Sequence, residues 1–150
     1  MGLERKFITK LHNSTKRDYL ARMNDSKAKC MNIAKKYGKD YWDGNRRYGY
    51  GGYKYIPGRW RDVAKKIIKT YKLKANSKIL DVGCGKGYLL REIKILEPKI
   101  KVYGFDTSNY ALKFIEKKNK KNFFIHKAQD KFPFKKNYFD LAISLATLHN

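Results

Sequence analysis

The residues best suited to chemistry lie in the stretch KILDVGCGKGYLL, residues 78–90. Asp81 ends an apolar run, and Gly83, Gly85 and Gly87 follow it at every second position. Glycine tolerates positive φ angles and lets a backbone approach a ligand closely. A carboxylate at the entrance of such a loop repels a pyrophosphate, so the pattern favours a ligand that carries an ammonium or sulfonium group.

The sequence patterns of two known phosphate-binding loops match this stretch poorly. A Walker loop, G-x-x-x-x-G-K-[ST], needs a hydroxyl residue after its lysine, whereas Gly87 follows Lys86. A dinucleotide fingerprint, G-x-G-x-x-G, needs its third glycine one position later, where the chain has Tyr88. The acid-first pattern D-x-G-x-G-x-G is the interpretation that remains.

A regular alternation of strands and helices must position this loop. Nearly continuous apolar runs predict strands at 78–82, 101–105, 122–126 and from 139 onward. Helical periodicity and cap residues predict helices at 59–73, at 88–96 and from 106–108 to about 117. This alternation favours an α/β fold with a doubly wound, mostly parallel, Rossmann-like sheet, in which ligands bind at the carboxyl ends of the strands.

Several linked motifs together resemble those of the class I S-adenosylmethionine-dependent methyltransferases, over roughly residues 60–150. LDVGCGKG is similar to the first motif of that family, and Asp106 ends the next strand nineteen residues after Gly87. HKAQDKFPF and FDLAISLATLHN are similar to the ends of its third and fourth strands. In the family, the acid after the second strand grips two ribose hydroxyls, and the third-strand exit lies against the adenine.

The resemblance implies S-adenosyl-L-methionine as cofactor and a binding site at matching positions. These are Asp81, Gly83, Cys84, Gly85, Gly87, Asp106, Thr107, Ala128, Gln129 and Asp130. Methyl transfer is an in-line displacement in which the protein mainly positions and desolvates the reactants. His149 is the candidate catalytic base for an acceptor that must lose a proton, with a packing role as the alternative. Asn150 is a candidate for orienting the acceptor.

Residues 37–60 differ in composition from the rest of the chain and are rich in tyrosine, glycine and arginine. Glycines at positions 44, 49, 51, 52 and 58, together with Pro57, argue against a regular helix there, so we expect a loop. As a lid over cofactor and acceptor, the loop offers apolar walls and guanidinium groups for an anionic acceptor. The candidate substrate residues are Tyr41, Trp42, Arg46, Arg47, Tyr53 and Arg59. Stacking of unpaired bases and simple packing on the flank of the sheet are the alternatives.

The formal net charge of +23 permits two interpretations. Lysines and arginines contact nucleic-acid phosphates, but an AT-rich genome also encodes many lysines together with Asn, Ile and Tyr. The fourth-strand motif SLATLHN lacks the [ND]-P-P-[YFW] pattern of enzymes that methylate base nitrogens. We therefore expect methyl transfer to a small-molecule or sugar-type acceptor. A basic RNA-associated methyltransferase or a non-catalytic nucleic-acid-binding protein is the alternative.

Composition limits the remaining possibilities. Cys30 and Cys84 lack partners at metal-ligand spacing, so the sequence predicts neither a disulfide nor a metal site. The charged N-terminus lacks a signal-peptide apolar region, and no apolar run approaches the roughly 18 residues of a membrane span. We expect a soluble cytoplasmic protein.

The predicted organisation is an N-terminal helical extension with the lid loop, residues 1–59, and an incomplete methyltransferase domain, residues 60–150. The family's sheet has seven strands, and this sequence is expected to supply its N-terminal half. The expected strand order 3-2-1-4 leaves the fourth strand as an unpaired edge, where pairing with another chain and aggregation are predicted. The sequence is therefore expected to be either an incomplete gene product or part of a longer sequence, and to retain a recognisable half of the cofactor site.

Overall fold

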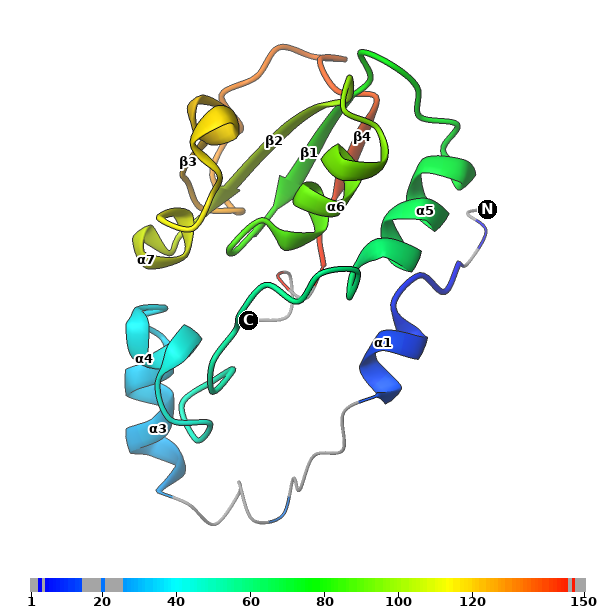
Figure 1. The fold of residues 1–150 in the computed structure, drawn as a ribbon. Helices are drawn as coiled ribbons and strands as arrows, with labels where there is room; N and C mark the ends of the chain where they lie inside the picture. The colour runs from blue at the N-terminus through cyan, green and yellow to red at the C-terminus, as the bar shows by residue number, and fades with distance from the viewer. Residues whose placement is uncertain (1–2, 4, 15–19, 21–25, 146, 148–150) are drawn as a thin grey trace.

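Four parallel strands form a sheet at the centre of the computed structural model, which describes residues 3, 5–14, 20, 26–145 and 147 (Figure 1). The strands are β1 (Lys78–Val82), β2 (Lys101–Asp106), β3 (Phe123–Ile125) and β4 (Leu141–Ile143). Their order is β3-β2-β1-β4, and every pair is parallel, which confirms the predicted order. Among the described residues β4 pairs with β1 alone, so it forms one edge of the sheet, as predicted.

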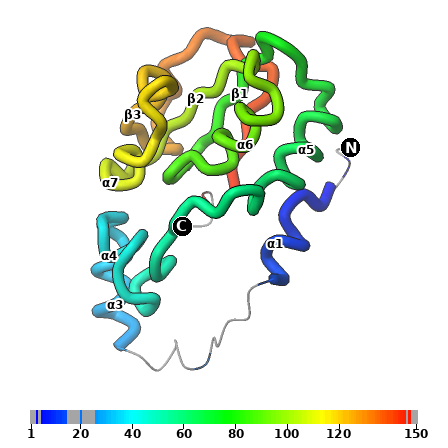
Figure 2. The backbone as a smooth tube through the Cα atoms, viewed as in Figure 1, coloured from blue at the N-terminus to red at the C-terminus, as the bar shows by residue number. Residues whose placement is uncertain are grey.

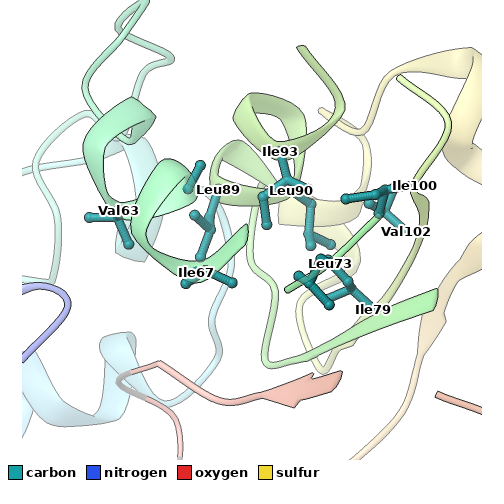
Figure 3. Close-up of a cluster of buried hydrophobic side chains, with 10 residues drawn as sticks. Val63, Ile67, Leu73, Ile79, Leu89, Leu90, Ile93, Ile100 and Val102 are labelled. Atoms are coloured by element: carbon teal, nitrogen blue, oxygen red, sulfur yellow. The ribbon is translucent and has the colours of Figure 1, made fainter. Parts of the chain in front are cut away.

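Two amphipathic helices, α5 (Arg61–Thr70) and α6 (Tyr88–Leu96), cover one face of the sheet. Their apolar positions pack against Ile79 of β1 and Val102 of β2 (Figure 3). Ile67 and Ile93 at the centre of this cluster are almost fully buried. Burial of each such side chain stabilises the fold by about 1.5–3 kcal/mol. Both predicted helices are confirmed, and none of the helices in the described ranges is long and apolar enough to cross a bilayer.

The opposite face of the sheet is covered by aromatic side chains. Because side chains alternate along a strand, Leu80, Val82 and Phe105 point away from α6 and form a second cluster. Phe134 and Phe139, from the segment between β3 and β4, pack against this cluster with their rings 4.6 Å apart. The described part of that segment contains no helix.

The connection from β2 to β3 is less helical than the sequence predicts. α7 (Asn109–Leu112) begins at Ser108, whose hydroxyl accepts from the Ala111 amide at 3.0 Å. The chain then forms a 3₁₀ helix, η1 (Lys117–Asn122), so the prediction of one helix to about residue 117 is wrong. The sequence KKNKKN of η1 disfavours an α-helix there, because lysines three and four positions apart would repel each other and Asn has a low helix propensity; it does not explain the earlier end of α7 at Leu112.

The described residues of the N-terminal part include three short helices: α1 (Thr9–Asn13), α3 (Lys27–Ala34) and α4 (Lys39–Asp43). α1 lies beside α5, where Phe7 stacks on Tyr71 with ring centroids 6.0 Å apart. α4 lies near α7, and the chain then runs back to α5 (Figure 2). The prediction that residues 37–60 contain no regular helix is wrong for α4, which lies between Gly38 and Gly44.

Candidate functional site

The glycine loop meets Asp106 at the carboxyl ends of β1 and β2. Gly83, Gly85 and Gly87 have φ angles of 75°, 54° and 71°, which favour glycine. The Gly85 amide donates to Asp106 Oδ2 at 2.8 Å, and the Ser108 amide donates to Asp106 Oδ1 at 2.8 Å. The loop and the acid after β2 therefore form one structural unit, although twenty-one residues separate Gly85 from Asp106.

Asp81 and Asp106 are two carboxyl groups that affect each other's ionisation. Burial, and then the charge of Asp106, raises the pKa of Asp81 to about 8. Burial also raises the pKa of Asp106, although amide hydrogen bonds from Ser108, Gly85 and Thr107 oppose that shift. Near neutral pH Asp81 is therefore mostly protonated, and a cationic group that came close would favour its ionisation.

The space left by each missing glycine side chain is filled by another residue of the chain. A Cβ atom on Gly85 would lie 2.7 Å from the ring of Trp42, and one on Gly87 would lie 2.5 Å from Ile115 Cδ1. A Cβ atom on Gly83 would overlap Thr147, whose hydroxyl donates to the Val82 carbonyl at 3.1 Å. The glycines are thus needed for backbone conformation and for packing within the protein; close approach of the loop to a ligand stays a prediction.

The aromatic segment (residues 37–60) contacts the loop mainly through Trp42. This side chain is 6% exposed, and its indole Nε1 donates to Ser108 Oγ at 2.9 Å and to the Tyr37 carbonyl at 3.1 Å. The ring of Tyr41 meets Trp42 edge-on at 5.3 Å. Tyr53 packs against Tyr88, the first residue of α6, with ring centroids 5.1 Å apart.

Lys86, a loop residue without an assigned role in the sequence analysis, binds the aromatic segment directly. Its Nζ lies 2.7 Å from both carboxylate oxygens of Asp43 and 2.8 Å from the Tyr53 carbonyl. Burial alone would raise the pKa of Asp43, but hydrogen bonds from Lys86 and Tyr110 and the charge of Lys86 hold it below its usual value. Asp43 and Lys86 look like ordinary surface charges in the sequence, and no spacing connects them.

Glu92 of α6 fixes the other end of the aromatic segment and was also missed. It is fully buried, and its carboxylate accepts from Tyr55 Oη at 2.6 Å, the Gly58 amide at 3.0 Å and Arg61 Nε at 3.2 Å. Its position on the apolar side of an otherwise regular amphipathic helix was the available signal.

A family model described as a methyltransferase domain matches residues 73–150, more than half of the chain. The chain belongs to the class I S-adenosylmethionine-dependent methyltransferases.

Three relatives illustrate the similarity. Malonyl-[acyl-carrier protein] O-methyltransferase of Legionella pneumophila is 33% identical over 78 residues, 50% of this chain and 28% of the relative. Ribosomal RNA small subunit methyltransferase G of Thermoanaerobacter sp. is 38% identical over 50 residues, 33% of this chain and 21% of the relative. A crystal structure of a SAM-dependent methyltransferase from Aquifex aeolicus is 28% identical, with a TM-score of 0.45, over 60% of this chain and 52% of that one. The methyltransferase chain thus spans less than a third of the curated relatives it matches.

The other predicted cofactor residues of this methyltransferase lie at the same edge of the sheet. Cys84 packs against Gly104, and burial, followed by the charges of Asp81 and Asp106, raises the pKa of its thiol, so the thiol is neutral near physiological pH. The side chain of Thr107 is exposed, next to Asp106.

Ala128, Gln129 and Asp130 follow β3, whose exit is joined to β2 by the His126 amide, which donates to the Asp106 carbonyl at 3.2 Å. Ala128 packs on the aromatic cluster, whereas Gln129 and Asp130 are exposed. The structure places this segment beside Asp106 but does not test its predicted contact with adenine. His126 was not predicted: its Nε2 atom is buried and lacks a hydrogen-bond partner among the described residues.

The predicted acceptor residues of the methyltransferase divide into two groups. Tyr41, Trp42 and Tyr53 lie against the glycine loop or α6, as described above. The three arginines are exposed: Arg46 donates to the Gly49 carbonyl, Arg47 lies over the Tyr48 ring, and Arg59 precedes α5. His149 and Asn150 lie outside the described residues, so their predicted roles are not tested.

Proposed function

We propose that this methyltransferase binds S-adenosylmethionine at the carboxyl ends of β1 and β2 and methylates a small-molecule or sugar-type acceptor. The observation that carries the proposal is the Asp106 carboxylate, held by the amides of Gly85 and Ser108. The Asp106 side chain stays partly exposed, and each carboxylate oxygen can accept more than one hydrogen bond, so ribose hydroxyls can still donate to it. Asp81, next to it, suits the ammonium group of the cofactor's amino-acid end.

The chain's own groups would act by binding and orientation. The amino end of α6 supplies unpaired amide groups and the positive end of the helix dipole for the cofactor's carboxylate. When bound, the cofactor supplies a methyl group that its sulfonium charge makes electrophilic. Asp106 fixes the ribose, and the aromatic segment excludes water from the reacting atoms.

Three exposed guanidinium groups, on Arg46, Arg47 and Arg59, support an anionic acceptor such as a phosphorylated or carboxylated sugar. If the acceptor must lose a proton, His149 is the candidate base and Asn150 a candidate for orienting the acceptor. Both assignments remain predictions from the sequence.

The decisive experiment is calorimetric titration with S-adenosylhomocysteine of the wild-type chain and of Asp106→Ala. Loss of the carboxylate should weaken binding by about 1–3 kcal/mol, roughly 5- to 150-fold, because the ribose hydroxyls lose a charged acceptor. Asp62→Ala, which removes an acid from the exposed first turn of α5, should bind like the wild type. Equal affinity of Asp106→Ala and wild type, with both variants folded by circular dichroism, would remove Asp106 from the site.

A second candidate function, action on RNA, is favoured by the way charges are distributed. Four of the acids, Asp43, Asp81, Glu92 and Asp106, are engaged inside the protein, which leaves the surface even more basic than the composition. Nine exposed lysines lie between residues 113 and 136, on the elements around β3, with only two acids among them. The rings of Trp42 and Tyr50 stack on each other with centroids 5.1 Å apart, so these faces are already used within the protein. Action on RNA would therefore depend on phosphate contacts rather than on stacking of bases on these two rings.

A further inference from the structure

The ion pair between Asp43 of α4 and Lys86 of the glycine loop joins two parts of the chain that the sequence keeps forty-three residues apart. The Lys86 side chain is 1% exposed, and a buried ammonium group is stable only with well-placed acceptors. Asp43 supplies two of them and the Tyr53 carbonyl a third, while the Phe114 ring lies 4.0 Å from Nζ. Breaking the pair would therefore disturb both partners.

Asp43 is held in one orientation by further hydrogen bonds. Tyr110 of α7 donates its hydroxyl to Asp43 Oδ2 at 2.8 Å, and the Tyr53 amide donates to Asp43 Oδ1 at 3.1 Å. The pair thus connects α4, the glycine loop and α7 at a single point. Movement of α4 relative to the loop requires all of these contacts to open.

Trp42, the residue before Asp43, is positioned by the same arrangement. Its ring lies against Gly85, and its indole donates to Ser108. Gly85 and Ser108 are two of the residues whose amides donate to the Asp106 carboxylate. Trp42 therefore contacts both Gly85 and Ser108, which flank the Asp106 carboxylate. In the proposed function this carboxylate binds the ribose.

Trp42 leaves that carboxylate accessible. The indole bonds the Ser108 hydroxyl and makes no hydrogen bond to Asp106, whose side chain stays partly exposed while Trp42 is buried. The Trp42 ring therefore forms one side of the nucleoside site and leaves the carboxylate oxygens of Asp106 able to accept hydrogen bonds from a ligand. An apolar wall that excludes water strengthens a charge-assisted hydrogen bond to a ligand.

We propose that Asp43 and Lys86 are positioning residues that hold Trp42 as a wall of the nucleoside site. Order in the aromatic segment and nucleoside binding are then coupled: each stabilises the other. The inference rests on the proposed function for the identity of the ligand, whereas the positioning itself is a property of the ligand-free chain.

The test compares Asp43→Asn, Lys86→Met and the double variant with Asp40→Asn. The control removes the same charge from an exposed position of the same helix. The first measurement is amide hydrogen exchange in the ligand-free chain at Gly52 and Tyr53, whose N–H groups donate to the Trp42 carbonyl at 3.1 and 2.9 Å. The second is calorimetric affinity for S-adenosylhomocysteine.

Each single variant should lose protection at these two amides and bind the nucleoside roughly tenfold more weakly, equivalent to about 1.4 kcal/mol. The double variant should bind no more weakly than the weaker single variant, because the two residues act as a pair. The control should match the wild type in both measurements.

Three results would overturn the proposal: unchanged exchange, additive losses of affinity, or tighter binding by the single variants, which would make Trp42 an obstacle. If the wild-type chain does not bind the nucleoside at all, the proposed function and the wall both fall. Hydrogen exchange then still decides whether the ion pair positions the aromatic segment, so the two failures can be told apart.

Discussion

Asp81 is a buried acid that holds its proton well above the usual range, with a pKa of about 8. The unfolded chain releases this proton near the ordinary value of about 4. Between these two pH values the native state binds more protons than the unfolded state, so Asp81 makes folding less favourable as the pH rises. Above about pH 8 its effect is constant.

The variant Asp81→Asn removes this titration. We expect its free energy of unfolding, relative to wild type, to rise by about 1 kcal/mol per pH unit between pH 5 and pH 8. Urea unfolding at several pH values measures the difference. A constant difference between variant and wild type over that range would show that Asp81 ionises normally in the folded protein.

Residues were predictable where a local pattern marks them. Asp81 and Gly85 lie in one continuous motif, and Asp106 ends a strand at the expected distance from it. No local sequence motif identifies Lys86 and Asp43, because their pairing depends on how the N-terminal part of the chain packs against the glycine loop. Contacts between parts distant in the sequence carry no periodicity from which to infer them.

At the scale of elements, Glu92 joins α6 to the entrance of α5. Burial alone would raise the pKa of Glu92, but hydrogen bonds from Tyr55, Gly58 and Arg61 outweigh it and lower the pKa. Its folded pKa is below the unfolded one, so its stabilising effect is present above about pH 4.5 and is lost as the pH falls through the folded value.

Replacing Glu92 by Ala should destabilise the chain by about 1–3 kcal/mol, because the Tyr55 hydroxyl and the Gly58 amide lose their acceptor, whereas the half-exposed Arg61 stays solvated. Chemical unfolding near neutral pH measures this change. Glu97→Gln, which removes the same charge from the residue after α6, should change stability by less than about 0.5 kcal/mol. Similar decreases in the free energy of unfolding for the two variants would show that the buried hydrogen bonds of Glu92 do not stabilise the fold.

The sequence predicted elements best where apolar residues are dense. β1 and α6 have the predicted bounds, since burial on the sheet determines them. α4 was missed because it is five residues long and its tryptophan was attributed to a loop. α7 ends at Leu112, about five residues before the predicted end of its helix, and the lysines of η1 disfavour an α-helix in the residues that follow.

At the scale of the whole molecule, the surplus of positive charge is the dominant property. Scattered surface lysines and a specific RNA site give different responses to salt and to substitution. Binding through phosphates releases counterions, so affinity falls steeply as the salt concentration rises.

If the lysines around β3 bind RNA, affinity for a single-stranded RNA should fall about tenfold or more between roughly 50 and 200 mM salt. Glutamine at Lys117, Lys118, Lys120 and Lys121 of η1 should reduce the steepness of this dependence. Glutamine at the matched exposed positions Lys65, Lys69, Lys72 and Lys74 should leave it nearly unchanged. Equal effects of the two sets would indicate diffuse attraction without a site, and leave the small-molecule acceptor as the better proposal.

The crowding at the three loop glycines decides how experiments on them are interpreted. Alanine at position 85 would press on an indole ring, and alanine at position 83 or 87 on Thr147 or Ile115. A loss of cofactor affinity in such variants would therefore report a displaced loop rather than a lost ligand contact. Scanning mutagenesis of this motif identifies ligand contacts only when each variant's own structure is checked first.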